Sequence, residues 1–151
     1  YGKYDSINYT VEHHTQVIGR LIDEEKIKVQ MGESGKVTYH DPCNLSRMLD
    51  IVDEPRTAIQ AASSNFQEME ESGRNTLCCG AGGALWWKKE TQGRTHLVRA
   101  EQVIESGADT VVTGCNFCFG MMKQGLGPMT PEGRTDVVVK DVADIVADNL
   151  V

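Results

Sequence analysis

The sequence lacks the features that mark several common classes of protein. Its 151 residues contain no apolar run near the roughly 20 residues of a membrane-spanning helix. Its start has no basic segment followed by an apolar one, as a signal peptide would have. Its net charge of −7 argues against a surface that binds nucleic acid. We therefore expect a soluble, cytoplasmic protein that has no direct membrane span and binds no nucleic acid.

The chain is too short for two comfortable hydrophobic cores. Its 151 residues suit one domain with one core. The sequence opens at Tyr1 without an initiator methionine, and residues 1–9 are mostly polar. We expect residues 1–151 to form a single domain that is the C-terminal portion of a longer chain.

Short apolar runs alternate with helical patterns along the chain. Strands are expected at 36–40, 66–69, 109–113 and 136–139. Helices are expected at 11–27, from Pro55 to about residue 62, and at 142–150. Another helix is expected to follow the glycine-rich turn 76–83 and to end at Gly107, and one more to begin at the turn 114–118 and run through Met121 and Met122. This order predicts an α/β fold with a mainly parallel sheet of about four strands, flanked by helices. Ligands of such sheets bind at loops beyond the carboxyl ends of the strands.

Cysteine is too sparse for a disulfide scaffold, and its count of five is odd. The thiols form three groups separated by 34 and 35 residues: Cys43, then Cys78 and Cys79, then Cys115 and Cys118. Each group follows an expected strand, so the three loops can meet at one edge of the sheet. A reducing compartment and one shared site fit this pattern better than disulfides do.

The spacing of the thiols narrows their chemistry. A Cys-x-x-Cys pair at a helix start suits zinc, thiol exchange or a cluster. Adjacent cysteines can share a site only through a turn, which Gly80, Gly82 and Gly83 allow. Bare backbone there can also donate N–H groups to sulfur. Because zinc takes four ligands, five cysteines favour a cluster of several irons.

The motifs His-Asp-Pro-Cys (40–43), Cys-Cys-Gly-Ala-Gly-Gly (78–83) and Cys-Asn-Phe-Cys (115–118) resemble the CCG, or cysteine-rich, domain. That family includes two of the subunits of heterodisulfide reductase and iron–sulfur subunits of hydroxy-acid and glycerol-3-phosphate oxidoreductases. The resemblance implies that all five cysteines bind a noncubane [4Fe-4S] cluster. It also implies an oxidoreductase that carries electrons to a disulfide or to a quinone or flavin partner.

Two features depart from the family pattern. Asn116 stands where many relatives carry a proline, which alters the turn but leaves ligation intact. The chain also has one CCG motif and no ferredoxin-type segment, so it resembles the C-terminal half of two-motif relatives. Electrons are therefore expected from partner subunits of ferredoxin-type, flavin or membrane haem character, which would place the protein in the cytoplasm or at the membrane face.

His40, beside the first cysteine, is the one weak candidate for a catalytic residue. It could donate a proton, or a hydrogen bond to a cluster sulfur, or simply be satisfied by backbone. A plain structural role is expected for five other side chains: the surface histidines His13, His14 and His96, and the core methionines Met121 and Met122. Two alternatives stand for each of the remaining groups. The tryptophans Trp86 and Trp87 belong to core and rim, or line a substrate cleft or dock a partner; the cations Arg47, Arg56, Lys88 and Lys89 are solvated, or offset cluster charge or receive an anionic substrate.

Two other functions remain open on the residues alone. One is a zinc-stabilised structural or interaction domain, with zinc in place of iron. The other is a metal-free thiol–disulfide enzyme that uses Cys115 and Cys118.

Overall fold

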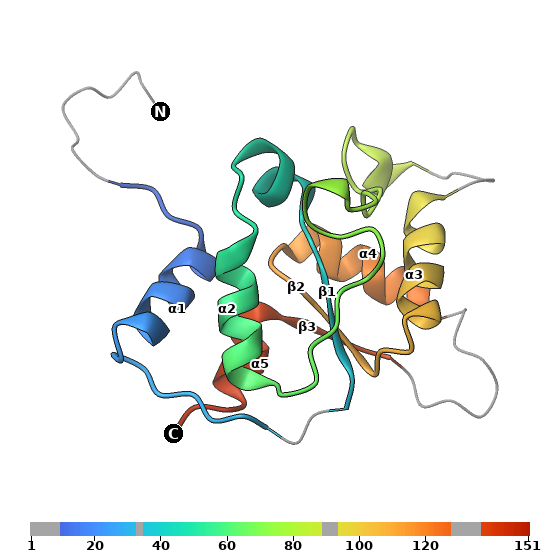
Figure 1. Cartoon of the computed structure of the whole chain (residues 1–151). Helices are drawn as coiled ribbons and strands as arrows, with labels where there is room; N and C mark the ends of the chain where they lie inside the picture. Colours follow the sequence, from blue (N-terminus) through green and yellow to red (C-terminus); the bar gives the residue numbers. More distant parts are fainter. Residues whose placement is uncertain (1–9, 33–34, 89–93, 128–136) are drawn as a thin grey trace.

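The computed structural model describes residues 10–32, 35–88, 94–127 and 137–151 (Figure 1). Three parallel strands form its sheet in the order β1 (Val37–His40), β2 (Thr110–Thr113), β3 (Val138–Asp141). Its α-helices are α1 (His14–Asp23), α2 (Asp53–Ala62), α3 (Thr95–Glu105), α4 (Asn116–Leu126) and α5 (Val142–Ala147). The expected α/β fold with a parallel sheet is confirmed.

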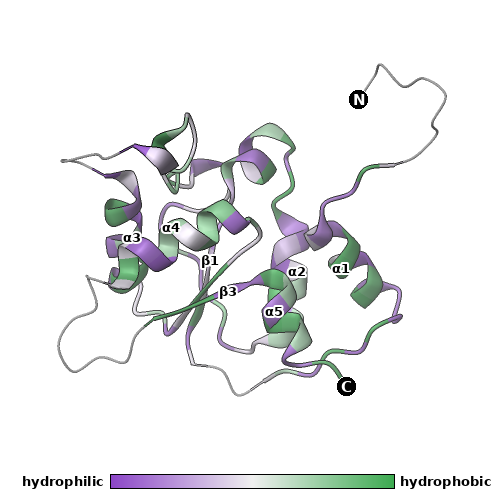
Figure 2. Ribbon diagram, turned by 180° about the vertical axis from the view of Figure 1, so that it is seen from behind, coloured by the Kyte–Doolittle hydropathy of each residue, from purple (hydrophilic) through white to green (hydrophobic). Residues whose placement is uncertain are grey.

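Helices cover both faces of the sheet. α1, α2 and α5 pack together on one face, and α3 and α4 pack on the other (Figure 1). Neighbouring residues of β2 point into different cores: Val111 contacts the α3–α4 side, and Val112 the α2–α5 side. Figure 2 shows hydrophobic residues along the first part of β3 and on α5, which pack against each other.

The expected fourth strand, 66–69, is reduced to one bridge. Phe66 pairs with Val37 in the parallel sense, and Gln67 donates to the Val37 carbonyl at 2.9 Å. Beyond it Glu68 turns to Arg56, whose Nε lies 2.5 Å from the Glu68 carboxylate. The described part of the chain therefore has three strands instead of about four.

Helix boundaries differ from expectation for local reasons. α1 starts at His14 because His13 caps it, with Nδ1 accepting from the Thr15 N–H and the Gln16 side chain accepting from the His13 N–H. α2 starts at Asp53, so Pro55 is its third residue; the first-turn N–H groups have no partner in the helix, which makes proline harmless there.

The remaining boundaries are close to expectation. α3 ends at Glu105, before Gly107 with φ +74°. β3 runs two residues later than expected, and Asp136 lies outside the described residues. None of the helices in the described ranges is long and apolar enough to span a membrane.

The irregular segment 70–77 is held by side chains from other parts of the chain. The Asp41 carboxylate accepts from the Gly73 N–H at 2.8 Å. The Arg47 guanidinium donates to the Thr76 carbonyl at 2.8 Å. Arg99 of α3 also binds this segment, as described below. These contacts fix the position of the backbone just before Cys78 and Cys79, although no strand leads into them.

Candidate metal centre

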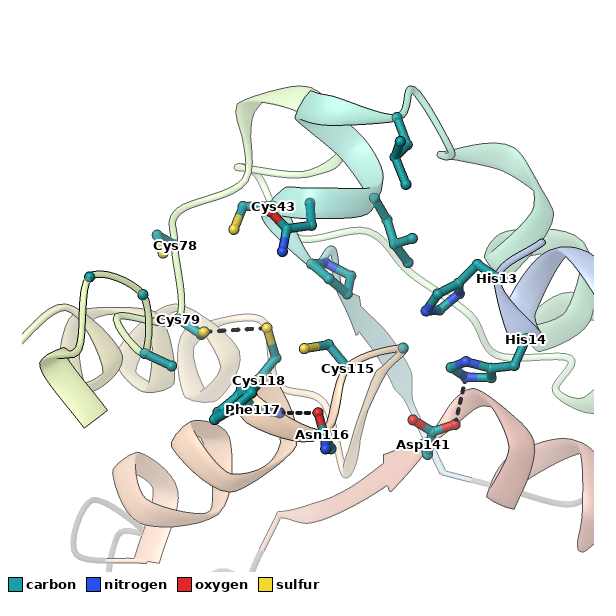
Figure 3. A pocket seen from close by; sticks show the side chains of 18 of the residues that line it. His13, His14, Cys43, Cys78, Cys79, Cys115, Asn116, Phe117, Cys118 and Asp141 are labelled. Carbon is teal, nitrogen blue, oxygen red and sulfur yellow. Dashed lines mark hydrogen bonds and ion pairs between the residues drawn. The ribbon is translucent and has the colours of Figure 1, made fainter. Parts of the chain in front are cut away.

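All five cysteines line one pocket of about 780 Å³ beyond the carboxyl ends of β1 and β2 (Figure 3). Cys43 follows β1 and caps a π-helical turn, η1 (Asn44–Met48). Cys115 is the N-cap of α4, and Cys118 lies in its first turn. The gathering expected from the strand order is therefore present, although Cys78 and Cys79 follow the 70–77 segment instead of a strand.

The five thiols differ in depth. Cys79 and Cys118 are buried, and their sulfurs lie 3.3 Å apart. Cys43, Cys78 and Cys115 are half-buried toward the pocket. The two buried cysteines thus form the closed floor of the site, and the three half-buried cysteines lie at its more open rim.

A glycine turn lets the adjacent cysteines share the pocket. Gly80 has φ +83°, and its N–H donates to the Cys78 sulfur at 3.3 Å. A side chain at this position would meet Thr95 and the backbone of His96. The expected turn and the expected N–H donation to sulfur are both present; Gly83 also has positive φ.

Hydrogen bonds divide the thiols by acidity. Bonds from the Cys118 thiol and from the N–H groups of Cys118 and Phe117 lower the pKa of Cys115 to about 6. The Cys118 thiol also lowers the pKa of Cys79, while its own pKa is raised because it keeps the shared proton. Burial raises the pKa of Cys78. These hydrogen bonds therefore favour the thiolate forms of Cys79 and Cys115, the form in which cysteine binds a metal.

His40 faces the buried sulfurs and is not satisfied by backbone. It is 0% exposed, and one ring nitrogen lies within 4.8 Å of the sulfurs of Cys79 and Cys118. Its Nδ1 accepts from the Arg99 Nε at 3.0 Å. Burial lowers the pKa of His40, so its ring is neutral.

The pocket wall across from Cys78 and Cys79 carries two histidines (Figure 3). His14 Nε2 lies 3.0 Å from the Asp141 carboxylate, and His13 packs at 3.6 Å from where a Gly114 side chain would begin. Both were expected to be ordinary surface residues, yet both line the pocket. The expectation for His96 was wrong, because it lies buried on the inner face of α3.

Aromatic side chains form part of the rim. Trp87 and Phe117 line the pocket, and both tryptophans make edge contacts with Phe117. Trp86 and Trp87 belong to a short 3₁₀ helix, η3 (Leu85–Trp87), and are 40% and 73% exposed. They therefore form a rim instead of a core. Met121 and Met122, in contrast, are buried as expected.

Among the described residues, none of the cations singled out from the sequence lines the pocket. Arg56 pairs bidentately with Asp41 at 2.8 and 3.0 Å and also binds Glu68. Lys88 is exposed, and Lys89 lies outside the described residues. The buried cation near the sulfurs is Arg99, which sequence reasoning missed. The spacing of residues 96, 99, 100 and 103, which is that of the buried face of a helix, was the feature of the sequence that could have indicated its burial.

The donor set suits a cluster better than one metal ion. Five thiols share one pocket, whereas one tetrahedral zinc ion would use four ligands. The sulfurs of Cys79 and Cys118 approach to 3.3 Å, and the lowered pKa of Cys79 and of Cys115 favours thiolates. The residues present therefore fit a thiolate-bound cluster.

Comparison with known proteins agrees with this geometry. Residues 37–123 match the family described as "Cysteine-rich domain". The chain is 33% identical over 142 residues to the probable iron-sulfur-binding oxidoreductase FadF of Bacillus subtilis, covering 93% of the chain and 20% of the relative. It is 33% identical over 146 residues to the EtfAB:quinone oxidoreductase of Syntrophomonas wolfei, covering 91% and 20%.

A third relative comes from the archaea. The dihydromethanophenazine:CoB–CoM heterodisulfide reductase of Methanosarcina barkeri has a subunit that is 31% identical over 149 residues, covering 94% of the chain and 34% of the relative. The chain thus spans between 20% and 34% of the length of these three relatives.

Proposed function

Because the chain belongs to the cysteine-rich domain family, we propose that it is the iron–sulfur-binding domain of an oxidoreductase. The observation that carries this proposal is the convergence of five cysteines from three separate loops on one pocket. The relatives, which include a probable iron-sulfur-binding oxidoreductase and a heterodisulfide reductase subunit, support the same chemistry.

The ligands would be Cys43, Cys78, Cys79, Cys115 and Cys118. A cubane [4Fe-4S] cluster uses four thiolates, so a fifth favours a noncubane [4Fe-4S] arrangement. When bound, the cluster would accept and release electrons. The protein would hold it at the floor with Cys79 and Cys118 and leave its rim open toward the pocket.

The acceptor would be a disulfide, or a quinone or flavin partner. The pocket of about 780 Å³ extends past the sulfurs to Trp87, Phe117 and the His14–Asp141 pair. The aromatic rings can exclude water from an apolar acceptor, and His13 and His14 place imidazole groups beside it. Reduction of a disulfide to two thiols consumes two protons with its two electrons, so imidazole groups that can relay protons suit that reaction.

The domain would work inside a larger protein or complex. Residues 1–151 would be one cysteine-rich domain of a longer chain, since the chain spans only 20% of two of its relatives. A second cysteine motif in that longer chain is part of the proposal. Ferredoxin-type, flavin or membrane haem subunits would supply or take its electrons. It would lie in the cytoplasm or, through these partners, at the membrane face.

The test is metal and sulfide analysis of protein prepared without oxygen. We expect about four irons and a similar amount of acid-labile sulfide per chain, with broad visible absorption. Stoichiometric zinc without sulfide would replace the proposal by a zinc-stabilised domain. A colourless, metal-free protein that exchanges disulfides would replace it by a thiol enzyme that uses Cys115 and Cys118.

Single substitutions then test the ligand set. Cys43→Ser, Cys79→Ser and Cys115→Ser come from three different loops, and each should lose or remodel the cluster spectrum. Met122→Leu is the control, because it removes a sulfur from the core of α4 without removing a thiol. A serine variant with an unchanged spectrum would remove that cysteine from the ligand set.

A further inference from the structure

Arg99 is a buried cation whose hydrogen bonds, in the described part of the chain, all reach neutral acceptors. Its side chain is 0% exposed. It donates to His40 Nδ1 at 3.0 Å, to the Glu71 carbonyl at 2.9 Å, to the Gln102 side-chain oxygen at 2.6 Å and to the Thr76 hydroxyl at 3.1 Å. A buried charge normally needs an opposite charge close by. The carboxylates of Asp41 and Glu71 act on Arg99 without a direct hydrogen bond, Cys118 adds to them, and a cluster bound by the cysteines would bring further negative charge close to it.

The bond from Arg99 also fixes the protonation of the His40 ring. A guanidinium has donors and no acceptor, so the nitrogen that receives its bond must carry a lone pair. The acceptor is Nδ1, so Nδ1 carries the lone pair and the single ring proton of His40 is on Nε2.

That Nε2–H group is buried beside the floor of the site. Nε2 has no hydrogen-bond partner in the described structure, although it is fully enclosed. Because Nδ1 is occupied by Arg99, Nε2 is the nitrogen free to face the sulfurs of Cys79 and Cys118, which lie within 4.8 Å of the ring. A buried donor without a partner costs stability, so this group calls for an acceptor at the metal centre.

The same bond keeps His40 from binding a metal. If Nε2 bound a metal, the ring proton would have to move to Nδ1. Two N–H groups, those of Nδ1 and of Arg99 Nε, would then point at each other. Although His40, Cys79 and Cys118 have the proximity of a metal-binding triad, the arginine makes the histidine a donor.

We propose that Arg99 and His40 form a positioning relay: Arg99 holds His40 as an Nε2–H donor to a sulfur of the cluster and excludes it from the ligand set. The relay rests on the iron–sulfur function proposed above. An N–H donor and a positive charge both stabilise the reduced, more negative cluster, so together they raise its reduction potential.

The experiment compares anaerobic wild type with His40→Leu, His40→Gln, Arg99→Met and Arg99→Lys. Iron is measured in each, the midpoint potential is followed by electron paramagnetic resonance, and couplings to ¹⁴N and to exchangeable protons are measured on the reduced cluster. Val103→Ala is the control for lost packing. Val103 is buried on the same face of α3 as Arg99, and its side chain has no group that could form a hydrogen bond with His40.

We expect every variant to keep the wild-type iron content. His40→Leu should shift the potential to a more negative value and lose an exchangeable-proton coupling, and His40→Gln, which keeps an N–H donor, should restore part of both. Arg99→Met should shift the potential in the same direction although Arg99 does not reach the sulfurs, and Arg99→Lys should shift it less. Val103→Ala should lower stability and leave the potential unchanged.

Two results would overturn the relay. Iron loss in His40→Leu, with a strong ¹⁴N coupling in wild type, would make His40 a ligand. Unchanged potentials in both His40→Leu and Arg99→Met would remove both residues from cluster tuning. If Arg99→Met does not fold, the two His40 variants decide alone. Absence of iron and sulfide from wild type would be a different failure, that of the proposed function itself.

Discussion

Individual cysteines in this site differ because each sulfur receives different donors. Cys115 sits at the start of α4, where N–H groups of the first turn point at its sulfur. Cys78 receives one N–H, from Gly80, but its burial outweighs that bond. Two thiols on the same rim thus have opposite tendencies to ionise.

This difference predicts the order in which the thiols react. In metal-free protein at pH 7, iodoacetamide should alkylate Cys115 before Cys78, because thiolate is the nucleophile and the pKa of Cys115 is about 6. Below pH 6 its rate should fall about tenfold per pH unit as the thiolate is protonated. Peptide mass spectrometry measures both sites in one sample. Faster labelling of Cys78 would contradict the assignment.

The same shift has a consequence for stability in the metal-free chain. The folded pKa of Cys115 lies below its unfolded value, so ionisation of this thiol adds to the free energy of unfolding above the unfolded pKa. That contribution shrinks as the pH falls and is gone below about 6.

Among single residues, the sequence was sufficient to predict the five cysteines of the site but not the side chains that surround them. The motifs identify the five thiols, and the glycines indicate the turn. The depth of Arg99 and His96 depends on which face of α3 meets the sheet, and a charged residue on an amphipathic helix is more often solvated. Their shared spacing with Val103 was the available signal.

Among the elements, α4 carries two of the five cysteines at its start. Asn116 is its first residue, and Cys115 before it has φ −149° and ψ 126°. Proline suits the first helical position, and it requires an extended residue before it, which Cys115 already is.

Asn116→Pro should therefore be tolerated. We expect it to raise the free energy of unfolding by about 0.4–1 kcal/mol, because it restricts the unfolded chain, and to leave the cluster spectrum unchanged. Urea titration and absorption spectra measure the two effects. A lost cluster would mean that the turn needs the Asn116 side chain, whose oxygen accepts from the Phe117 N–H at 3.0 Å.

α3 and α4 approach each other closely at Gly125. A β-carbon there would lie 2.8 Å from the His96 carbonyl oxygen and 2.9 Å from the Ala100 side chain. Gly125→Ala should destabilise the domain by about 1–3 kcal/mol through overpacking. Gly127→Ala is the matched control, because Gly127 has open space around it. Equal melting temperatures for the two variants would show that the helices can separate at no cost.

The elements themselves were largely predictable, since helical spacing of apolar residues reports a helix buried on one face and a short apolar run reports a strand buried on both faces. The segment 66–69 was not, because an edge strand persists only where its partner offers free backbone groups and competing side chains are absent. Here Glu68 meets Arg56, which is also paired with Asp41. Such a choice depends on tertiary neighbours that the local sequence does not specify.

For the whole molecule, a bound cluster would connect three loops that are distant in sequence. Oxygen should bleach the visible spectrum, release iron and lower the melting temperature, because the loops lose their common crosslink and the freed cysteines oxidise. Each kcal/mol lost should lower it by about 2–4 °C in a domain of this size. Absorbance, iron release and melting are followed in the same samples during controlled exposure. Bleaching with an unchanged melt would show that the cluster is peripheral to folding.

The way segment 70–77 is held bears on how far this motif can be moved between proteins. Its path depends on Asp41, Arg47 and Arg99, which lie outside it in the sequence. A graft of residues 78–83 onto another scaffold would carry the vicinal thiols and the glycine turn but none of these anchors. The unit that can be transferred is therefore the motif together with Asp41, Arg47 and Arg99. A graft of the contiguous residues alone would give a loop whose position on the new scaffold is not fixed.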